Sequence, residues 1–247
     1  MAELYGHKLF GDSSLKAYYR LEDANDSGPN GYTLTNNGSI PFNMAKFRNG
    51  GDLGASNSTD YFNRNTAIIS PLADYTISIL VKLQTEIGSG IYEFIRIENN
   101  TDKHVIYCQY QYNGGTRRIH YQQDRWVIAG YGPDYNVTLG IADWYHLVFR
   151  INSASMQIYV NGIAAGSPVT MDSYVAGSTA TNNQLLIGAG NTVGTSTIIN
   201  YSSIIVDDVA IFSRALTVAE IYSLYVSQVK KFENKLRPAI FTPGIAR

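Results

Sequence analysis

Residues 204–225 read IIVDDVAIFSRALTVAEIYSLY and carry the strongest structural signal in the chain. The segment IIVDDVAIF is rich in the β-branched and aromatic residues that favour strands, with two aspartates in its middle. Adjacent carboxylates at Asp207 and Asp208 would be costly to bury without a cation or hydrogen-bond donors beside them. Thr217 and Glu220 have the spacing of a capping box, in which each side chain accepts from the other residue's backbone amide. The stretch therefore predicts a strand that leads into a short, docked helix.

The composition is that of a sheet protein with many turns. The 247 residues include 19 Tyr and 22 Gly, and 16% of the residues are charged. This length suits one large all-β domain or two small ones. A net charge of −1 provides no basic surface, so neither nucleic acid nor an anionic membrane is expected as a partner. The single cysteine, Cys108, excludes an internal disulfide and is expected to be a small buried residue.

The N-terminus of the chain as given shows no secretion signal. The N-terminal MAELYGHKLFGD has no basic start followed by an apolar run, and no stretch of about 18 apolar residues occurs anywhere. We therefore expect a soluble chain without a signal peptide or membrane insertion in the sequence as given. The C-terminal PAIFTPGIAR lies beyond the predicted helix, so residues 230–247 are expected to form an extended arm.

Apolar segments of strand length recur throughout the chain, separated by clusters of Gly, Asn, Asp or Ser. They are residues 15–21, 67–69, 75–83, 91–97, 105–112, 117–121, 144–151, 156–160, 184–187 and 204–212. In 144–151 the apolar odd-numbered residues alternate with the even-numbered ones, and 156–160 is followed by Asn161-Gly162, a strong hairpin signal. This pattern predicts an all-β, antiparallel two-sheet β-sandwich or jelly roll.

Four separated segments resemble laminin-G-like, concanavalin A-like lectin/glucanase domains. Residues 15–34 resemble the opening strand and loop of these domains, and DYTISILV at 74–81 resembles a later strand, with Leu80 where a tryptophan usually stands. Residues 144–162 resemble their "W-x-H-v…l-Y-v-N-G" hairpin, and 206–220 resemble their closing strand and helix start. The resemblance implies a concanavalin A-like jelly roll with one concave and one convex sheet. It places the domain at 13–229, between an N-terminal extension (1–12) and the C-terminal arm (230–247).

The resemblance also implies a structural calcium ion that ties the first loop to the last strand. The corresponding ligands are Asp26, Asn30, Asp207 and Asp208. Calcium takes six to eight oxygen ligands, which carboxylates, amides and backbone carbonyls supply. Strand alternation sends Asp207 and Asp208 to opposite faces, so only one of them is expected to ligate through its side chain. In the alternative interpretation, Asp26 forms an Asx-turn while the two aspartates pair with Arg20 or Arg214.

The sequence gives little support for catalysis. Glycoside hydrolases on this scaffold need paired carboxylates on one strand face. Glu93 and Glu98 are five residues apart, an offset that predicts opposite faces. A lyase is disfavoured because His120 and Tyr121 are adjacent and also predicted to face opposite ways. His146 is expected to be a packed, hydrogen-bonded residue, and no enzyme activity is expected.

The segment 107–135 is rich in Tyr mixed with Gln, Asn, Arg and Asp, which suits either a sugar-binding surface or a protein interface. The predicted carbohydrate-binding residues are Trp126, Tyr131, Asp134 and Tyr135. The leading hypothesis is a non-enzymatic lectin-like or adhesion module that binds a glycan or polysaccharide, outside the cell, on its surface or on a virion. The rival hypothesis is a structural virion or tail component that self-associates through the C-terminal arm, which contains Ile240-Phe241.

Overall fold

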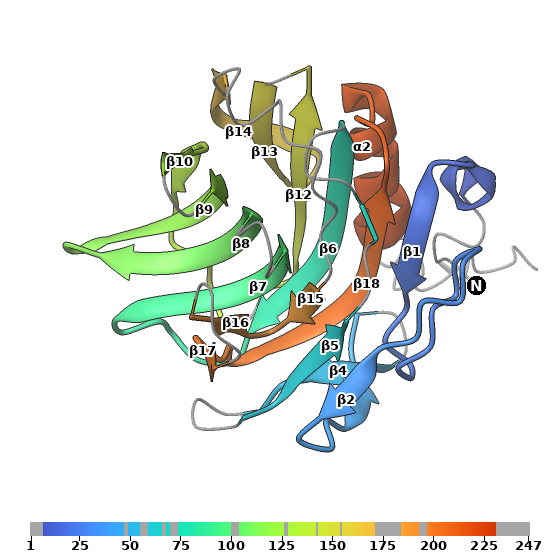
Figure 1. Cartoon of the computed structure of the whole chain (residues 1–247), viewed down its shortest axis with the longest axis horizontal. Coiled ribbons are helices and arrows are strands. Elements are labelled where there is room, and N and C mark those ends of the chain that lie inside the picture. Colours follow the sequence, from blue (N-terminus) through green and yellow to red (C-terminus); the bar gives the residue numbers. More distant parts are fainter. Residues whose placement is uncertain are drawn as a thin grey trace, which may run out of the picture.

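The computed structural model describes residues 7–46, 49–54, 59–65, 68–69, 74–99, 104–125, 128–141, 143–153, 155–170, 184–192 and 197–230. Within them, two large antiparallel sheets and one short α-helix form the sandwich that the sequence predicts (Figure 1). Residues 231–247 of the predicted arm lie outside this part of the chain.

The first sheet contains the strand of the opening motif. Its strands are β1 (Leu15–Tyr19), β3 (Phe42–Met44), β4 (Asn49–Asp52), β6 (Tyr75–Leu83), β12 (Tyr145–Asn152), β13 (Ser155–Val160), β14 (Ile163–Thr170) and β18 (Ile204–Phe212). Their order across the sheet is β14-β13-β12-β6-β18-β4-β3, and β1 pairs with β18 beside this path.

The second sheet is built mainly from the middle of the chain. Its strands are β2 (Thr35–Asn37), β5 (Tyr61–Arg64), β7 (Gly90–Asn99), β8 (His104–Asn113), β9 (Thr116–Arg125), β10 (Ile128–Tyr131), β11 (Asp134–Asn136) and β15 (Gln184–Ile187). Their order is β10-β9-β8-β7-β15-β5-β2, and β11 pairs with β9. Short strands β16 (Gly190–Asn191) and β17 (Ile198–Ile199) form a separate pair.

The predicted strands are found, with one exception. Nine of the predicted segments overlap β1, β6, β7, β8, β9, β12, β13, β15 and β18. The predicted strand at 67–69 is not found at Ile68 and Ile69, which are buried but lie outside any strand. These two residues contribute apolar packing without ladder hydrogen bonds, which an apolar sequence pattern cannot distinguish from a short strand.

The main core fills the space between the two large sheets. Alternate residues of β6 such as Ile77, Ile79 and Val81 are fully buried in it. A second apolar cluster lies on the other face of the first sheet, where Phe212 packs with residues of helix α2 (Val218–Tyr225) such as Leu224. Helix α2 covers this face in Figure 1. Strand β18 is therefore buried on both faces, which explains its nearly continuous apolar sequence.

The hairpin predicted at 144–162 is confirmed. Strand β12 pairs with β13, and Asn161 and Gly162 have φ values of 51° and 79° in the turn to β14. Positive φ at both positions is what a two-residue hairpin turn requires. His146 is fully buried, lies 2.9 Å from Ser78 Oγ through its Nε2, and stacks on Tyr225. It is thus a packed, hydrogen-bonded residue, as expected.

A β-bulge in β18 corrects the expectation that Asp207 and Asp208 face opposite ways. Val206 and Val209 both belong to the main core, although strict alternation would separate inward residues by two positions. The pairing of β18 with β6 shifts register between Asp207 and Ala210, and Asp208 has a φ of 45°. The extra residue places both aspartates between two inward-facing valines.

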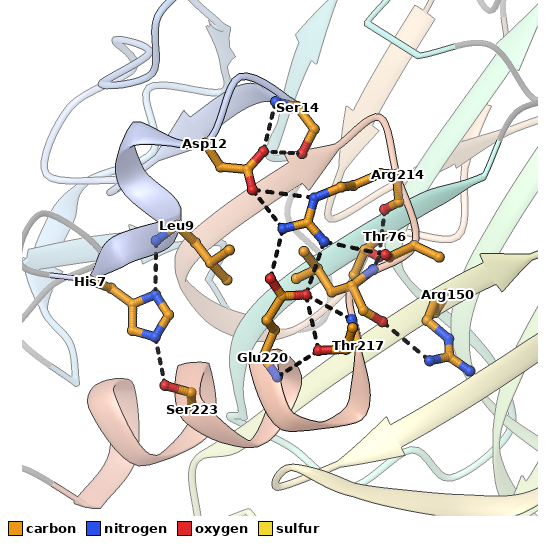
Figure 2. Close-up of polar contacts among 12 residues, drawn as sticks. His7, Leu9, Asp12, Ser14, Thr76, Arg150, Arg214, Thr217, Glu220 and Ser223 are labelled. Atoms are coloured by element: carbon orange, nitrogen blue, oxygen red, sulfur yellow. Dashed lines mark hydrogen bonds and ion pairs between the residues drawn. The ribbon is translucent and has the colours of Figure 1, made fainter.

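A charged cluster joins the N-terminal residues to helix α2 (Figure 2). Arg214 donates to Asp12 from Nη2 at 2.5 Å and to Glu220 at 2.8 Å, and Glu220 completes the predicted capping box with Thr217. A second link joins His7, beside the 3₁₀ turn η2 (Lys8–Gly11), to Ser223 at 2.8 Å. Residues 7–12 of the predicted N-terminal extension therefore pack against the sandwich. The last described turn is η3 (Val226–Lys230).

Candidate functional site: a polar groove on the second sheet

An open groove of about 480 Å³ lies on the outer face of β7, β8 and β9, away from the main core. Five carboxamide side chains line it: Gln109, Gln111, Gln122, Asn191 and Asn200. The other lining residues are Ile91, Arg96, Tyr107, His120, Thr192 and Ile199. Planar polar groups beside an aromatic ring are suited to a ligand with many hydroxyl groups.

Strand alternation puts these polar side chains on one face. In β8 the inward residues Ile106, Cys108 and Tyr110 belong to the main core, so the residues between them face outward. Antiparallel pairing then sets Gln109 opposite His120 on β9, in register with the neighbouring groove residues. Cys108 is buried, as the sequence indicates.

A second β-bulge shapes the floor of the groove. The pairing of β7 with β8 shifts register between Glu93 and Ile95, and Phe94 and Ile95 both belong to the main core. The extra residue returns Glu93, Arg96 and Glu98 to the same, outer face. The expectation that Glu93 and Glu98 face opposite ways is therefore wrong. The bulge adds one unpaired residue to the strand, so two residues that are five positions apart lie on the same face.

Five residues on the floor form a buried polar cluster. Arg96 Nε donates to Glu98 Oε2 at 2.8 Å, and the amide nitrogen of Asn191 donates to Glu98 Oε1. Gln109 Nε2 donates to Glu93 Oε2 at 2.7 Å. Each of the five residues is at most 4% exposed. Gly190 covers the cluster closely, since a Cβ there would come within 2.7 Å of Glu93 Oε2.

The two carboxyl groups of this cluster have different surroundings. Burial raises the pKa of Glu93 to about 8, opposed by the nearby Arg96 charge and by hydrogen bonds. Glu98 shares the ion pair with Arg96. Two atoms of groove-lining residues, Arg96 Nη2 and Asn191 Oδ1, are buried without a hydrogen-bond partner among the described residues. Buried polar atoms without a partner reduce the free energy of unfolding unless water or a ligand forms hydrogen bonds with them.

The β9 side of the groove carries a second polar network. His120 lies between Asp134 and Gln122, with Nδ1 at 2.6 Å from Asp134 Oδ1 and Nε2 at 2.5 Å from Gln122 Oε1. Asp134 also accepts from Arg118 at 2.7 Å, and Arg118 donates to Gln111 Oε1. These bonds fix the orientation of two groove-lining amides.

The predicted carbohydrate-binding residues occupy different places. Asp134 is exposed beside the groove and contacts its lining residue His120. Tyr135 is half-buried and packs against the main core, since it pairs with the inward-facing Ile119. Trp126 lies outside the described residues, as does the side chain of Tyr131. Of the two members whose side chains are described, Asp134 lies beside the groove and Tyr135 does not.

The predicted calcium ligands already have other partners. Both carboxylate oxygens of Asp26 accept backbone amides, from Tyr18 and Gly28 at Oδ1 and from Tyr32 at Oδ2. The bond from Gly28 closes the Asx-turn of the alternative interpretation. The Asn30 amide donates to the Lys16 carbonyl at 2.8 Å.

The strand aspartates do not complete the predicted set. Asp208 accepts from the Tyr18 hydroxyl and from Gln228 Nε2, so Asp26 and Asp208 contact opposite ends of Tyr18. Arg20 pairs with Glu22, and Arg214 with the Asp12–Glu220 cluster. Among the described residues, no three His, Cys, Asp or Glu side chains form a group suited to a metal. Three of the four predicted ligands, Asp26, Asn30 and Asp208, are therefore held by protein groups and do not fit a shared calcium shell in this arrangement, while calcium binding itself stays a prediction.

Sequence reasoning missed the groove itself, although part of its signal was present. Tyr107, Gln109 and Gln111 recur at every second position of β8, as do His120 and Gln122 in β9, alternating with apolar residues. The contributions of Arg96 and Asn191 could not be found this way, because one depends on a bulge and the other on a distant strand.

A family model described as the concanavalin A-like lectin/glucanases superfamily matches residues 54–222. Comparison with curated proteins gave no match. Across the described ranges, no helix is long and apolar enough to cross a membrane.

Three solved structures illustrate the likeness in fold. Botulinum neurotoxin type C, whose cell entry depends on interaction with two ganglioside molecules, has a TM-score of 0.66 and 14% identity over 87% of this chain and 51% of that one. The binding domain of botulinum neurotoxin DC in complex with SialylT has a TM-score of 0.64 and 13% identity over 87% and 52%. Domain 4 of AbnA, a GH43 extracellular arabinanase from Geobacillus stearothermophilus, in complex with arabinotriose, has a TM-score of 0.59 and 18% identity over 86% and 98%.

The chain spans about half the length of these toxin chains and nearly all of the arabinanase domain. Identities this low show the fold alone. The family model covers more than half of the chain and includes the hairpin and closing-strand motifs. The protein belongs to the concanavalin A-like lectin/glucanases superfamily.

Proposed function

We propose that this protein is a carbohydrate-binding module that holds a glycan in the groove on β7, β8 and β9. The observation that carries the proposal is the lining of five carboxamides around Tyr107. Carboxamides both donate and accept hydrogen bonds, as sugar hydroxyls do, and their neighbours fix several of them in place. The binding of arabinotriose by an arabinanase domain of the same fold supports this class of ligand.

Hydrolysis is the second candidate, because the bulge in β7 places Glu93 and Glu98 on one face. Two observations favour binding over catalysis. Both carboxyl groups are buried, and the groove is lined by their partners Arg96, Gln109 and Asn191 and not by the carboxyl groups themselves. The two glutamates therefore serve to orient groove side chains, and we propose a non-catalytic role.

A glycan array with the purified chain, followed by calorimetry on the best ligand, tests the proposal. Substituting Gln111→Ala or Gln122→Ala removes one fixed amide and should weaken binding about fivefold, since a hydrogen bond contributes about 1 kcal/mol. Product analysis after prolonged incubation with the same ligand should show no cleavage.

The matched control is Asn25→Ala, which removes an exposed amide that does not line the groove. It should bind like the wild type. The absence of any glycan hit, or wild-type affinity in both groove variants with unchanged thermal unfolding, would overturn the proposal. Release of shorter sugars would favour the hydrolase.

We further propose that the module acts outside the cell, on a cell surface or on a virion, as the glycan ligand suggests. Self-association through residues 230–247 remains the alternative use of the fold. Light scattering on the full chain and on a chain truncated after residue 229 tests this alternative. The same monomeric mass for both would rule out self-association through these residues.

A further inference from the structure

The buried cation at the groove floor is neutralised by the protein itself. Arg96 pairs with Glu98 at 2.8 Å, and the two side chains are 2% and 3% exposed. Glu93 lies beside them on the same face, and its pKa of about 8 keeps it uncharged at neutral pH. Ionisation of Glu93 at higher pH would add a negative charge. The floor therefore offers no excess positive charge at either pH.

The Arg118 cation on the β9 side is also neutralised. Asp134 contacts Arg118 at 2.7 Å and His120 at 2.6 Å with its two oxygens. Arg96 and His120 are the basic side chains that line the groove in the described part of the chain, and both face a carboxylate of the protein. A ligand carboxylate would meet no uncompensated cation here, and burying it without one is costly.

The partnerless atoms on the floor suit a hydroxyl better than a carboxylate. The Asn191 amide is oriented by two bonds from its nitrogen, to Glu98 and to Gln184 at 3.2 Å, so its oxygen is the atom left over. Among the described residues, Arg96 Nη2 is a donor without a hydrogen-bond partner, whereas Asn191 Oδ1 is an acceptor without one. A hydroxyl can accept a hydrogen bond from Arg96 Nη2 and donate one to Asn191 Oδ1. A carboxylate can only accept, and it is repelled by Asn191 Oδ1 and Glu98.

We infer that the groove selects uncharged glycans and discriminates against sugars that carry carboxylate groups. The inference rests on the proposed function, because it names the ligand class of the same groove. The selecting residues are the self-neutralised pairs Arg96–Glu98 and Arg118–Asp134, together with the fixed acceptor of Asn191.

The test compares glycans that share a backbone and differ in charge. Suitable pairs are highly methyl-esterified and de-esterified homogalacturonan, and lactose and sialyllactose, within an array that also holds other neutral and acidic glycans. We expect the hits to be uncharged and any acidic counterpart to bind at least about tenfold more weakly, a difference of about 1.4 kcal/mol. Equal or tighter binding of acidic glycans would overturn the inference and leave the proposed function standing. No hit of either kind would instead overturn the proposed function.

Asp134→Asn provides a second test that does not depend on a buried residue, because Asp134 is exposed. It uncovers the charge of Arg118, so acidic glycans should gain about fivefold in affinity at low salt and lose that gain at high salt. The matched control Asp23→Asn removes an exposed carboxylate outside the groove lining and should leave the discrimination unchanged. An equal effect of both substitutions, or no effect of Asp134→Asn, would contradict the assigned role of the Arg118–Asp134 pair.

Discussion

Glu93 shows how one extra residue in a strand changes the chemistry of a surface. Its position in the sequence predicts a face opposite to Glu98, but the bulge at Phe94 and Ile95 turns both carboxyl groups outward. Burial under Gly190 and hydrogen bonding from Gln109 then hold the Glu93 carboxyl in a site where burial raises its pKa to about 8. The protonated form is therefore the one that the fold favours at neutral pH.

This raised pKa makes Glu93→Gln a test at the scale of one residue. The folded state keeps its proton as pH rises above the ordinary value of 4.5, whereas the unfolded state loses it, so the wild type should lose stability up to about pH 8. Gln mimics the protonated carboxyl, and its variant should lack this loss. Thermal unfolding at pH 5 and pH 8 measures this loss of stability. The unfolding midpoint should shift by roughly 2–4 °C for each kcal/mol of unfolding free energy in a chain of this size. If the midpoints of the wild type and the variant changed equally with pH, this would contradict a protonated Glu93 in the folded state.

At the scale of elements, helix α2 depends on a cluster of charges that spans the chain. Arg214 joins Asp12 before β1 to Glu220 in the first turn of α2, as Figure 2 shows. The capping box could be predicted from sequence because its two residues are three apart. The partnership with Asp12 could not, since it joins residues that meet only when β1 pairs with β18.

Arg214→Gln should destabilise the protein by about 1–2 kcal/mol at pH 7, because it removes charged hydrogen bonds from a partly buried cluster. Hydrogen bonds from Arg214 lower the pKa values of Asp12 and Glu220 to about 2. Their contribution is present above the ordinary values of 3.8 and 4.5 and is lost as pH falls towards 2.

The difference between the variant and the wild type should therefore shrink between pH 5 and pH 2 in thermal unfolding. Arg117→Gln is the control, because Arg117 pairs with the mostly exposed Glu86 at 3.3 Å and should change stability by less than about 0.5 kcal/mol. If the difference in stability between the wild type and Arg214→Gln were the same at all pH values, Arg214 would act through packing alone.

At the scale of the whole molecule, the first loop and the last strand of the domain are joined through hydrogen bonds to Tyr18. Asp26 serves three backbone amides, and Asp208 binds the hydroxyl of Tyr18 and the amide of Gln228. Protein groups thus already donate to the carboxylates of two of the predicted calcium ligands, Asp26 and Asp208.

We therefore expect thermal unfolding of the whole chain to have the same midpoint in calcium and in chelator. Ligand binding to the native state would otherwise raise the midpoint with calcium concentration. Asp26→Asn should lower the midpoint in both solutions, since it weakens the bonds to backbone amides. A calcium-dependent midpoint in the wild type that Asp26→Asn abolishes would restore the calcium site.

The sequence by itself determined the sandwich, most of its strands, the 144–162 hairpin and the capped helix. These features are encoded by period-two alternation and by short-range turn and cap patterns, which act within a few residues. Only the tertiary structure decided the groove. Two bulges overturned the predictions that Glu93 faces opposite to Glu98 and that Asp207 faces opposite to Asp208. Pairing between distant strands brought Asn191 beside Arg96. A bulge is set by how side chains pack between sheets, so residues 204–225 could indicate the strand and helix without showing which way their aspartates point.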